Sequence, residues 1–162
     1  IDLGAAPKHP WKIMADLWRR DNHPGNAYMY SKRALEEDPD DVDLWAQTAG
    51  AAAIVDSAQA ALAYIDTAIQ RFGATDPLLA SRATYLSFAN KHDSAEAIFR
   101  SLIAKDTASV QYRLNLAHAL SAQSSKEKKR EALQLYQKVA PKLPPEFKID
   151  SLIQTLDSTL NR

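Results

Sequence analysis

The fold is decided by residues 45–61, WAQTAGAAAIVDSAQAA. This stretch holds a tryptophan at position 45 and alanines at positions 49 and 61, and all three positions recur at intervals of 34 residues. The recurring residues are Trp11, Trp45 and Leu79; Ala15, Ala49, Ala83 and Ala117; and Ala27, Ala61 and Ala95. A fixed internal period of this length predicts a stacked array of two-helix repeats.

The recurring alanines have a physical reason. Only a small side chain lets the two helices of a repeat approach closely where they cross, and alanine is also the best helix former. The tryptophans would fill the wedge between one repeat and the next, so we interpret Trp11, Trp18 and Trp45 as core residues rather than as a ligand cage. Every strong apolar period is helical and no alternating strand pattern persists, which predicts an all-α fold.

Composition limits the classes of function. The chain has 162 residues, of which 46% are hydrophobic, and its 20 basic residues balance its 20 acidic ones. That balance does not favour nucleic acid or an anionic membrane as a partner. No apolar run approaches the length of a membrane span. Without cysteine there is no disulfide framework, thiolate metal site or cysteine nucleophile, and with only four glycines a nucleotide-binding loop is improbable.

The repeated residues resemble the tetratricopeptide repeat family. The resemblance covers four consecutive repeats within residues 8–145, namely 8–41, 42–75, 76–109 and 110–145. It implies a right-handed superhelical array of helix-turn-helix units. Three extra residues break the register of the fourth repeat, and we place this insertion between its two helices, around Ser124-Ser125-Lys126.

Local signals predict the helix ends. Pro10 and Pro24 stand where a first helical residue is expected, and Pro77 follows Asp76, a good N-cap. Either Asp56 or Ser57 suits the start of the second helix of repeat two, and either Asp93 or Ser94 suits that of repeat three.

Both ends of the chain lie outside the four repeats. Residues 1–7 read as the tail of a preceding repeat or a linker, which would make the chain a fragment of a longer repeat protein. Residues 146–162 carry a mostly helical apolar stripe and are expected to form a C-terminal capping helix over the last repeat.

Clusters that could carry chemistry have simpler interpretations. None of the four histidines has a second metal-type ligand at helical spacing, and the acidic cluster at 36–43 lacks the spacing of a calcium loop. We therefore expect no catalytic residue, no metal and no cofactor. The basic run from Lys126 to Arg130 suits a solvated helix start, but it could also dock an acidic partner.

The resemblance places a concave groove along the first helix of each repeat. The groove residues it implies are Lys12, Asp16, Arg19, Ala46, Gly50, Ala80, Thr84, Ser87, Leu114 and His118. Among them, Lys12 alone matches the clamp with which chaperone-binding members hold a terminal carboxylate. The middle of the groove is small and uncharged, and His118 could change its charge near neutral pH.

These observations predict a non-catalytic scaffold that binds a peptide or helix of a partner protein in the groove, and they do not identify that partner. Two alternatives stay open: a structural spacer that self-associates through stacked repeats, and a regulatory appendage of an enzyme elsewhere in a parent chain. We expect a soluble protein, in the bacterial periplasm rather than the cytoplasm. The binding site is either the groove or the basic run.

Overall fold

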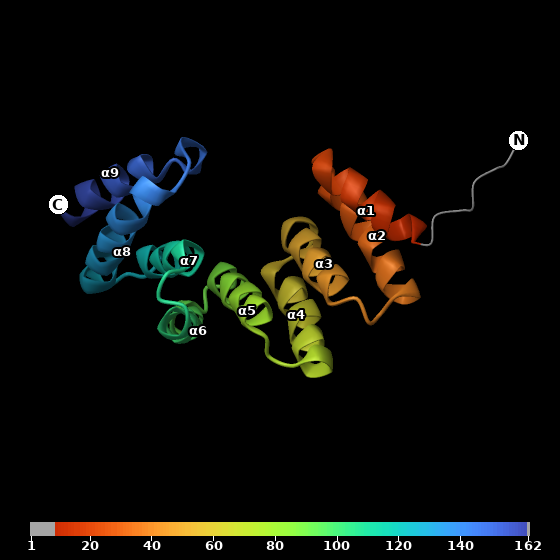
Figure 1. Ribbon diagram of the computed structural model, residues 1–162. Helices are drawn as coiled ribbons and strands as arrows, with labels where there is room; N and C mark the ends of the chain where they lie inside the picture. The colour runs from red at the N-terminus through yellow and green to blue at the C-terminus, as the bar shows by residue number, and fades with distance from the viewer. Residues whose placement is uncertain (1–8, 162) are drawn as a thin grey trace, which may run out of the picture. The chain divides into compact units, whose positions relative to one another are not determined.

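The computed structural model describes residues 9–161, which form α-helices, two short 3-10 helices and no strand (Figure 1). The all-α prediction is therefore confirmed for the described residues. Their bounds are α1 Pro10–Arg20, α2 Pro24–Glu37, α3 Val42–Val55, α4 Ala58–Phe72, α5 Asp76–Phe88, α6 His92–Lys105, α7 Val110–Ser121, α8 Lys126–Val139, η1 Ala140–Lys142, η2 Pro145–Phe147 and α9 Ile149–Leu160. The residues expected to be the tail of a preceding repeat lie outside the described part of the chain.

The chain divides into two compact units, residues 1–81 and 82–162. In unit 1, α1 packs on α2, α2 on α3 and α3 on α4. In unit 2, α6 packs on α7, α7 on α8 and α8 on α9. The division falls within α5, whose first residues belong to unit 1 and whose remainder belongs to unit 2.

The alanine columns lie in the core. Ala49, Ala61, Ala83, Ala95 and Ala117 are completely buried, as their predicted place between packed helices requires. Two of the three tryptophans also pack as predicted, because Trp11 and Trp45 lie half-buried against the buried cluster of Ala34, Leu35 and Leu44. The Trp45 indole nitrogen also donates a hydrogen bond of 2.9 Å to the backbone oxygen of Pro39.

Helix starts follow the sequence signals with two exceptions. Helix α5 begins at Asp76, so that Asp76 is its first residue rather than its N-cap, and Pro77 is its second. Pro10 and Pro24 begin α1 and α2, and Ser57 rather than Asp56 caps α4, its hydroxyl accepting a hydrogen bond from the Ala60 amide. The prediction of Asp93 or Ser94 as a cap was wrong, because α6 begins earlier, at His92. Asn90 adopts a left-handed conformation with φ 59° in the turn between α5 and α6, as Asn22 does with φ 56° in the turn between α1 and α2.

The three extra residues of the fourth repeat lie in α8 and not in the preceding loop, which corrects the sequence prediction. The second helices begin at residues 24, 58, 92 and 126, exactly one period apart. The buried alanine is the fourth residue of α2, α4 and α6, whereas Ala132 is the seventh residue of α8. The added residues therefore extend α8 at its N-terminus by almost one turn.

The last helix packs where a cap was expected. Helix α9 lies against α8, with Ile149 and Leu156 buried. Phe147 lies in the 3-10 helix η2, just before α9, and is 47% exposed, although it belongs to the apolar stripe predicted for residues 146–162. No helix within the described residues is both long and apolar enough to cross a membrane.

Candidate functional site

The predicted groove residues of unit 1 do not all line one cavity. Lys12 forms an ion pair with Asp41, the residue that caps α3 by accepting hydrogen bonds from two backbone amides. The hydrogen bond from Lys12 and those amides lower the pKa of Asp41, although burial works against this change. The charge of Lys12 is therefore paired within unit 1, in a contact that links α1 to the start of α3.

Asp16 and Arg19 lie on the same face of α1. The Arg19 guanidinium donates a hydrogen bond of 2.9 Å to an Asp16 carboxylate oxygen, and both side chains stay accessible to solvent. Arg19 also lines a cavity of about 260 Å³ together with Gly50 of α3. We call this the unit 1 cavity; its lining is Arg19, Asn22, Pro24, Ala27, Gln47, Gly50, Ala51 and Ile54.

The remaining two predicted residues of unit 1 lie elsewhere. Ala46 lines a separate hollow of about 270 Å³ with Asp43 and Phe72. Ala80 lies on α5 and is half-buried. In unit 1, Arg19 and Gly50 thus line the same cavity. Lys12 and Ala46 do not line that cavity.

Unit 2 has a larger cavity of about 480 Å³, which we call the unit 2 cavity. Its lining is Thr84, Ser87, Phe88, Asn90, His92, Phe99, Asn115, His118 and Ala122. Three of these residues, Thr84, Ser87 and His118, belong to the predicted groove. Phe99 is completely buried, while Phe88 is 65% exposed. The cavity therefore has a buried aromatic residue and an accessible one in its wall.

Leu114 was predicted to line the groove, and this prediction was wrong. Its side chain is 3% exposed and belongs to the core of unit 2. The helix α7 is apolar on more than one face, so that Leu114, Leu116, Ala117 and Leu120 are all buried. Spacing alone could not distinguish the buried leucine from a groove residue on such a helix.

His118 is held by contacts within unit 2. Its Nδ1 atom lies 2.8 Å from the Tyr136 hydroxyl, and the two rings meet edge to face with centroids 5.4 Å apart. The Tyr136 hydroxyl also lies 3.3 Å from the hydroxyl of Ser121. Burial of the imidazole against these neighbours lowers the pKa of His118 below its ordinary value, which favours the neutral ring near pH 7.

The two cavities occupy equivalent positions in the repeat. Residues 68 apart, which is two periods, line both of them. The equivalent pairs are Arg19 and Ser87, Asn22 and Asn90, Pro24 and His92, Gln47 and Asn115, Gly50 and His118, and Ile54 and Ala122. The chemistry differs between them: the lining of the unit 1 cavity includes one charged residue, Arg19, which pairs with Asp16, whereas the lining of the unit 2 cavity has no Lys, Arg, Asp or Glu.

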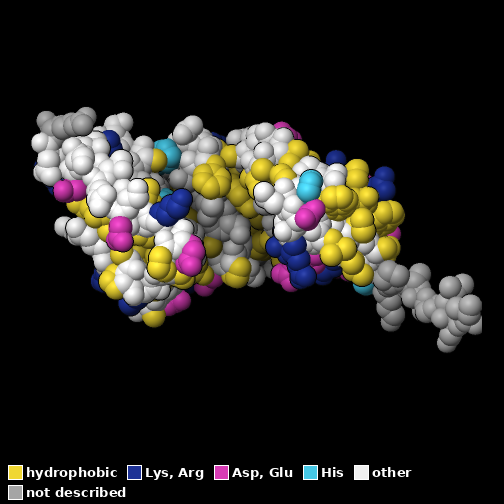
Figure 2. All heavy atoms as spheres, turned by 90° about the horizontal axis from the view of Figure 1, so that it is seen from above, with side chains coloured by type: hydrophobic (Ala, Val, Ile, Leu, Met, Phe, Trp, Pro, Cys, Tyr) yellow, Lys and Arg dark blue, Asp and Glu magenta, His cyan; other side chains and the backbone are white. Residues whose placement is uncertain are grey.

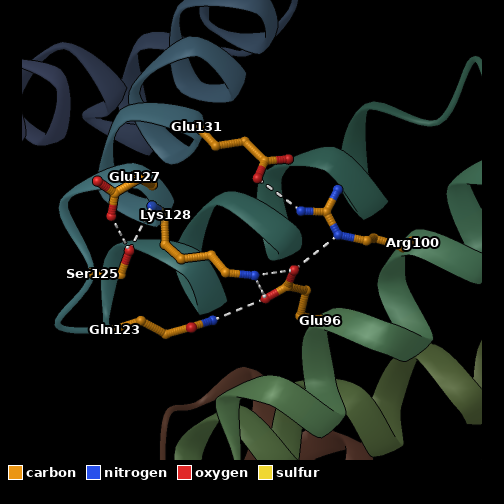
Figure 3. A network of polar contacts seen from close by, with 7 residues as sticks. All are labelled: Glu96, Arg100, Gln123, Ser125, Glu127, Lys128 and Glu131. Carbon is orange, nitrogen blue, oxygen red and sulfur yellow. Dashed lines mark hydrogen bonds and ion pairs between the residues drawn. The ribbon is translucent and has the colours of Figure 1, made fainter.

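The basic run contains a lysine with an internal partner. Lys128 of α8 donates hydrogen bonds of 2.5 and 2.6 Å to the carboxylate of Glu96 on α6 (Figure 3). Glu96 also accepts hydrogen bonds from Arg100 at 2.9 Å and from Gln123 at 3.2 Å. Burial would raise the pKa of Glu96, but these hydrogen bonds lower it to about 2.

Comparison with solved structures identifies the fold. A structure of MamA from Desulfovibrio magneticus RS-1 superposes with a TM-score of 0.73 at 16% sequence identity, covering 97% of this chain and 88% of that one. The second TPR domain of human RPAP3, solved with an HSP70 peptide, gives 0.59 at 19% identity over 67% of this chain and 91% of that domain. YrrB, described as a TPR protein with an unusual peptide-binding site, gives 0.61 at 15% identity over 93% and 76%.

The chain has a tetratricopeptide-repeat-like fold. At these identities the likeness concerns the fold alone. No protein-family profile matches the sequence, and no curated protein matches it.

Several residues that line the cavities of this tetratricopeptide-like chain were not predicted from the sequence. They are Asn22, Gln47, Ile54, Asn90, His92 and Asn115. The interval of 68 residues would have paired Gln47 with Asn115 and Asn22 with Asn90. In contrast, no sequence signal shows that the side-chain amides of these four residues reach a cavity wall, because this depends on how the helices cross.

Proposed function

We propose that the protein is a non-catalytic interaction scaffold that binds a peptide or helix from a partner protein, without nucleic acid or a cofactor. The observation that carries this proposal is the equivalence of the two cavities. Each is lined by residues of first helices, and each has a prominent apolar side chain at its edge, Ile54 at 72% exposed and Phe88 at 65%. Exposed apolar side chains beside a concave surface are typical of binding sites.

Solved structures of the same fold support this proposal. The RPAP3 domain was solved with a bound peptide, and the YrrB structure is described by its peptide-binding site. The chain differs from a carboxylate-clamp domain, because its one clamp-like lysine, Lys12, is paired with Asp41. The expected ligand is therefore an internal segment of a partner rather than an acidic terminus.

The proposal can be tested with a phage-displayed library of 12-residue peptides selected on the full chain. Binding of the selected peptides, synthesised with a fluorophore, is then measured by fluorescence polarisation. Gly50→Arg puts a long charged side chain into the unit 1 cavity, and Phe88→Ser removes the exposed ring of the unit 2 cavity. We expect each peptide to lose affinity about tenfold or more with at least one of these variants.

Two control variants separate the alternatives. Lys138→Glu changes an exposed charge on α8 and should leave affinity unchanged. Lys126→Glu tests the rival hypothesis that the basic run is the binding site. If no peptide is selected, or if the selected peptides respond to Lys126→Glu but to neither cavity variant, the proposed groove function is wrong.

A second function, self-association through stacked repeats, is favoured by the surface of α1. Ile13 and Leu17 are one turn apart and 47% and 53% exposed, and Met29 of α2 is 42% exposed. Figure 2 shows hydrophobic side chains gathered at the α1 end of unit 1. A second copy could cover this face. Sedimentation velocity at 10–200 µM (about the range for weak self-association) should show dimerisation that Leu17→Glu abolishes; a monomer throughout excludes this function.

A further inference from the structure

The unit 2 cavity has hydrogen-bonding groups whose direction can be worked out from their neighbours. The Ser121 hydroxyl donates its proton to the backbone oxygen of His118 at 2.9 Å. It therefore cannot also donate to Tyr136, and its oxygen accepts from the Tyr136 hydroxyl at 3.3 Å. The Tyr136 oxygen then accepts from Nδ1–H of His118 at 2.8 Å, so that all three contacts are hydrogen bonds.

This arrangement fixes the tautomer of His118. When Nδ1 donates its proton to Tyr136, Nε2 of the neutral ring carries the lone pair and can accept a hydrogen bond. Burial raises the pKa of Tyr136, so its hydroxyl stays protonated and keeps donating to Ser121. His118 lies in the cavity wall with part of its side chain accessible, and within the described residues only Tyr136 hydrogen bonds to its ring. Nε2 is thus available as an acceptor to a molecule in the cavity.

Asn115 supplies a donor one turn earlier on α7. Its side-chain oxygen accepts a hydrogen bond of 2.9 Å from the Gln111 amide. The amide nitrogen of Asn115, with two protons, has no partner among the described residues. The cavity wall therefore presents one neutral acceptor, His118 Nε2, and one neutral donor, three residues apart on one face of a helix. A hydroxyl group on the occupant, which both donates and accepts, would satisfy the two.

The rest of the lining restricts the occupant further. It contains no Lys, Arg, Asp or Glu, so an ionised group would lose its water without gaining a counter-charge. Phe88, which is 65% exposed, offers apolar ring surface to an aromatic side chain, for which an edge or offset contact adds to the gain from burial. A volume of about 480 Å³ is within the range of small-ligand sites and suits one side chain with its adjoining backbone.

We infer that the unit 2 cavity binds a tyrosine side chain of the partner peptide, with its ring against Phe88 and its hydroxyl group donating a hydrogen bond to His118 Nε2 and accepting one from Asn115. This inference deepens the proposed scaffold function and rests on it. Phenylalanine would keep the contact with Phe88 but leave His118 Nε2 and the Asn115 amide without a partner after displacing their water, which costs more than the missing hydrogen bonds alone. The cavity should accordingly prefer tyrosine.

The test uses N-acetyl-L-tyrosinamide as the probe and the full chain labelled with nitrogen-15 and carbon-13. Heteronuclear NMR titration should move the side-chain signals of Asn115, His118 and Phe88, with a dissociation constant of about 1–10 mM, as expected for a ligand of this size. N-acetyl-L-phenylalaninamide should bind about tenfold more weakly, and the amide of N-acetyl-L-aspartate should leave these signals unmoved.

Variants on the exposed rim provide a matched comparison. Phe88→Ala should weaken binding of the tyrosine probe at least fivefold, while Ile54→Ala, an equally exposed apolar residue of unit 1, should not change it. Asn115→Ala should reduce the difference between the tyrosine and phenylalanine probes, because it removes one donor. Circular dichroism spectra establish that all variants are folded.

Several outcomes would overturn the inference. These are equal affinity for the tyrosine and phenylalanine probes, tighter binding of the aspartate probe, or no response of the three cavity signals. Failure of the scaffold proposal is a separate result. If the selected peptides lack tyrosine and depend on Gly50, the scaffold proposal is supported and the tyrosine site is wrong. If the probe moves the three NMR signals but no peptide is selected, the tyrosine site is supported and the scaffold proposal is wrong.

Discussion

Replacing Glu96 with glutamine should lower the free energy of unfolding by about 3 kcal/mol at pH 7. The carboxylate is 8% exposed and accepts hydrogen bonds from Lys128, Arg100 and Gln123. Its pKa falls from the ordinary 4.5 to about 2. A difference of that size between the folded and unfolded chain is worth about 3 kcal/mol when the group is ionised. Glutamine keeps the shape and removes the charge.

The effect should depend on pH with a definite sign. Because the folded pKa is lower than the unfolded one, the ionised carboxylate contributes its full stability above about pH 4.5. That contribution is lost as the pH falls toward 2. The difference between the parent chain and Glu96→Gln should therefore be largest near pH 7 and shrink steadily below pH 4.5.

The assay is urea unfolding followed by far-ultraviolet circular dichroism at several pH values between 3 and 7. Glu131→Gln provides the matched control, because Glu131 pairs with Arg100 at 2.7 Å and its side chain is 37% exposed. A surface pair of this kind contributes about 0–1 kcal/mol. Equal losses in the two variants, or a loss for Glu96→Gln that does not change with pH, would refute the view that Glu96 is the stabilising centre of the network.

Three further predictions concern the core, His118 and the last helix. Ala49→Leu should destabilise the chain by about 1–3 kcal/mol in urea unfolding, because a completely buried alanine leaves no room for a larger side chain; an unchanged midpoint would contradict the helix crossing. Burial lowers the pKa of His118, so the stability that the neutral ring contributes is complete above about pH 6.5 and is lost as the pH falls through the lower pKa of the folded chain. NMR titration of the ring should therefore give a midpoint below pH 6.5. A higher midpoint would contradict the packing against Tyr136. Deleting residues 148–162 removes Ile149 and Leu156 from α8 and should cause self-association in sedimentation velocity, whereas an equally stable monomer would show that α9 is not a cap.

The sequence predicted the helices and their core well, because both depend on local patterns. Buried alanine at the crossings follows from the closeness of two backbones, and proline at a first helical position follows from its fixed φ. These requirements act within one repeat, so each can be recognised at intervals of 34 residues. Ala49 and Pro24 could be placed for this reason.

The cavity residues were predicted less well, because their positions depend on long-range packing. Lys12 was expected in the groove, but its ammonium group forms an ion pair with Asp41, the N-cap of α3, which is 29 residues away. Leu114 has the spacing of a groove residue, but α7 is covered on that face. Asn115 and Gln47 were not predicted, since a polar residue on a helix surface looks the same in a sequence whether it meets solvent or a cavity.

The added turn of α8 explains how this array tolerates a change in length. Three residues rotate a helix by about 300°, which is close to a full circle, so the new turn presents its side chains on nearly the same face as the old one. Lys128 is four residues before Ala132 and therefore lies above it, on the face that looks toward Glu96. An insertion of five residues would rotate the new turn by about 500° and point its side chains away. Evolution or design could thus lengthen a second helix in steps of three or four residues and gain a new contact each time.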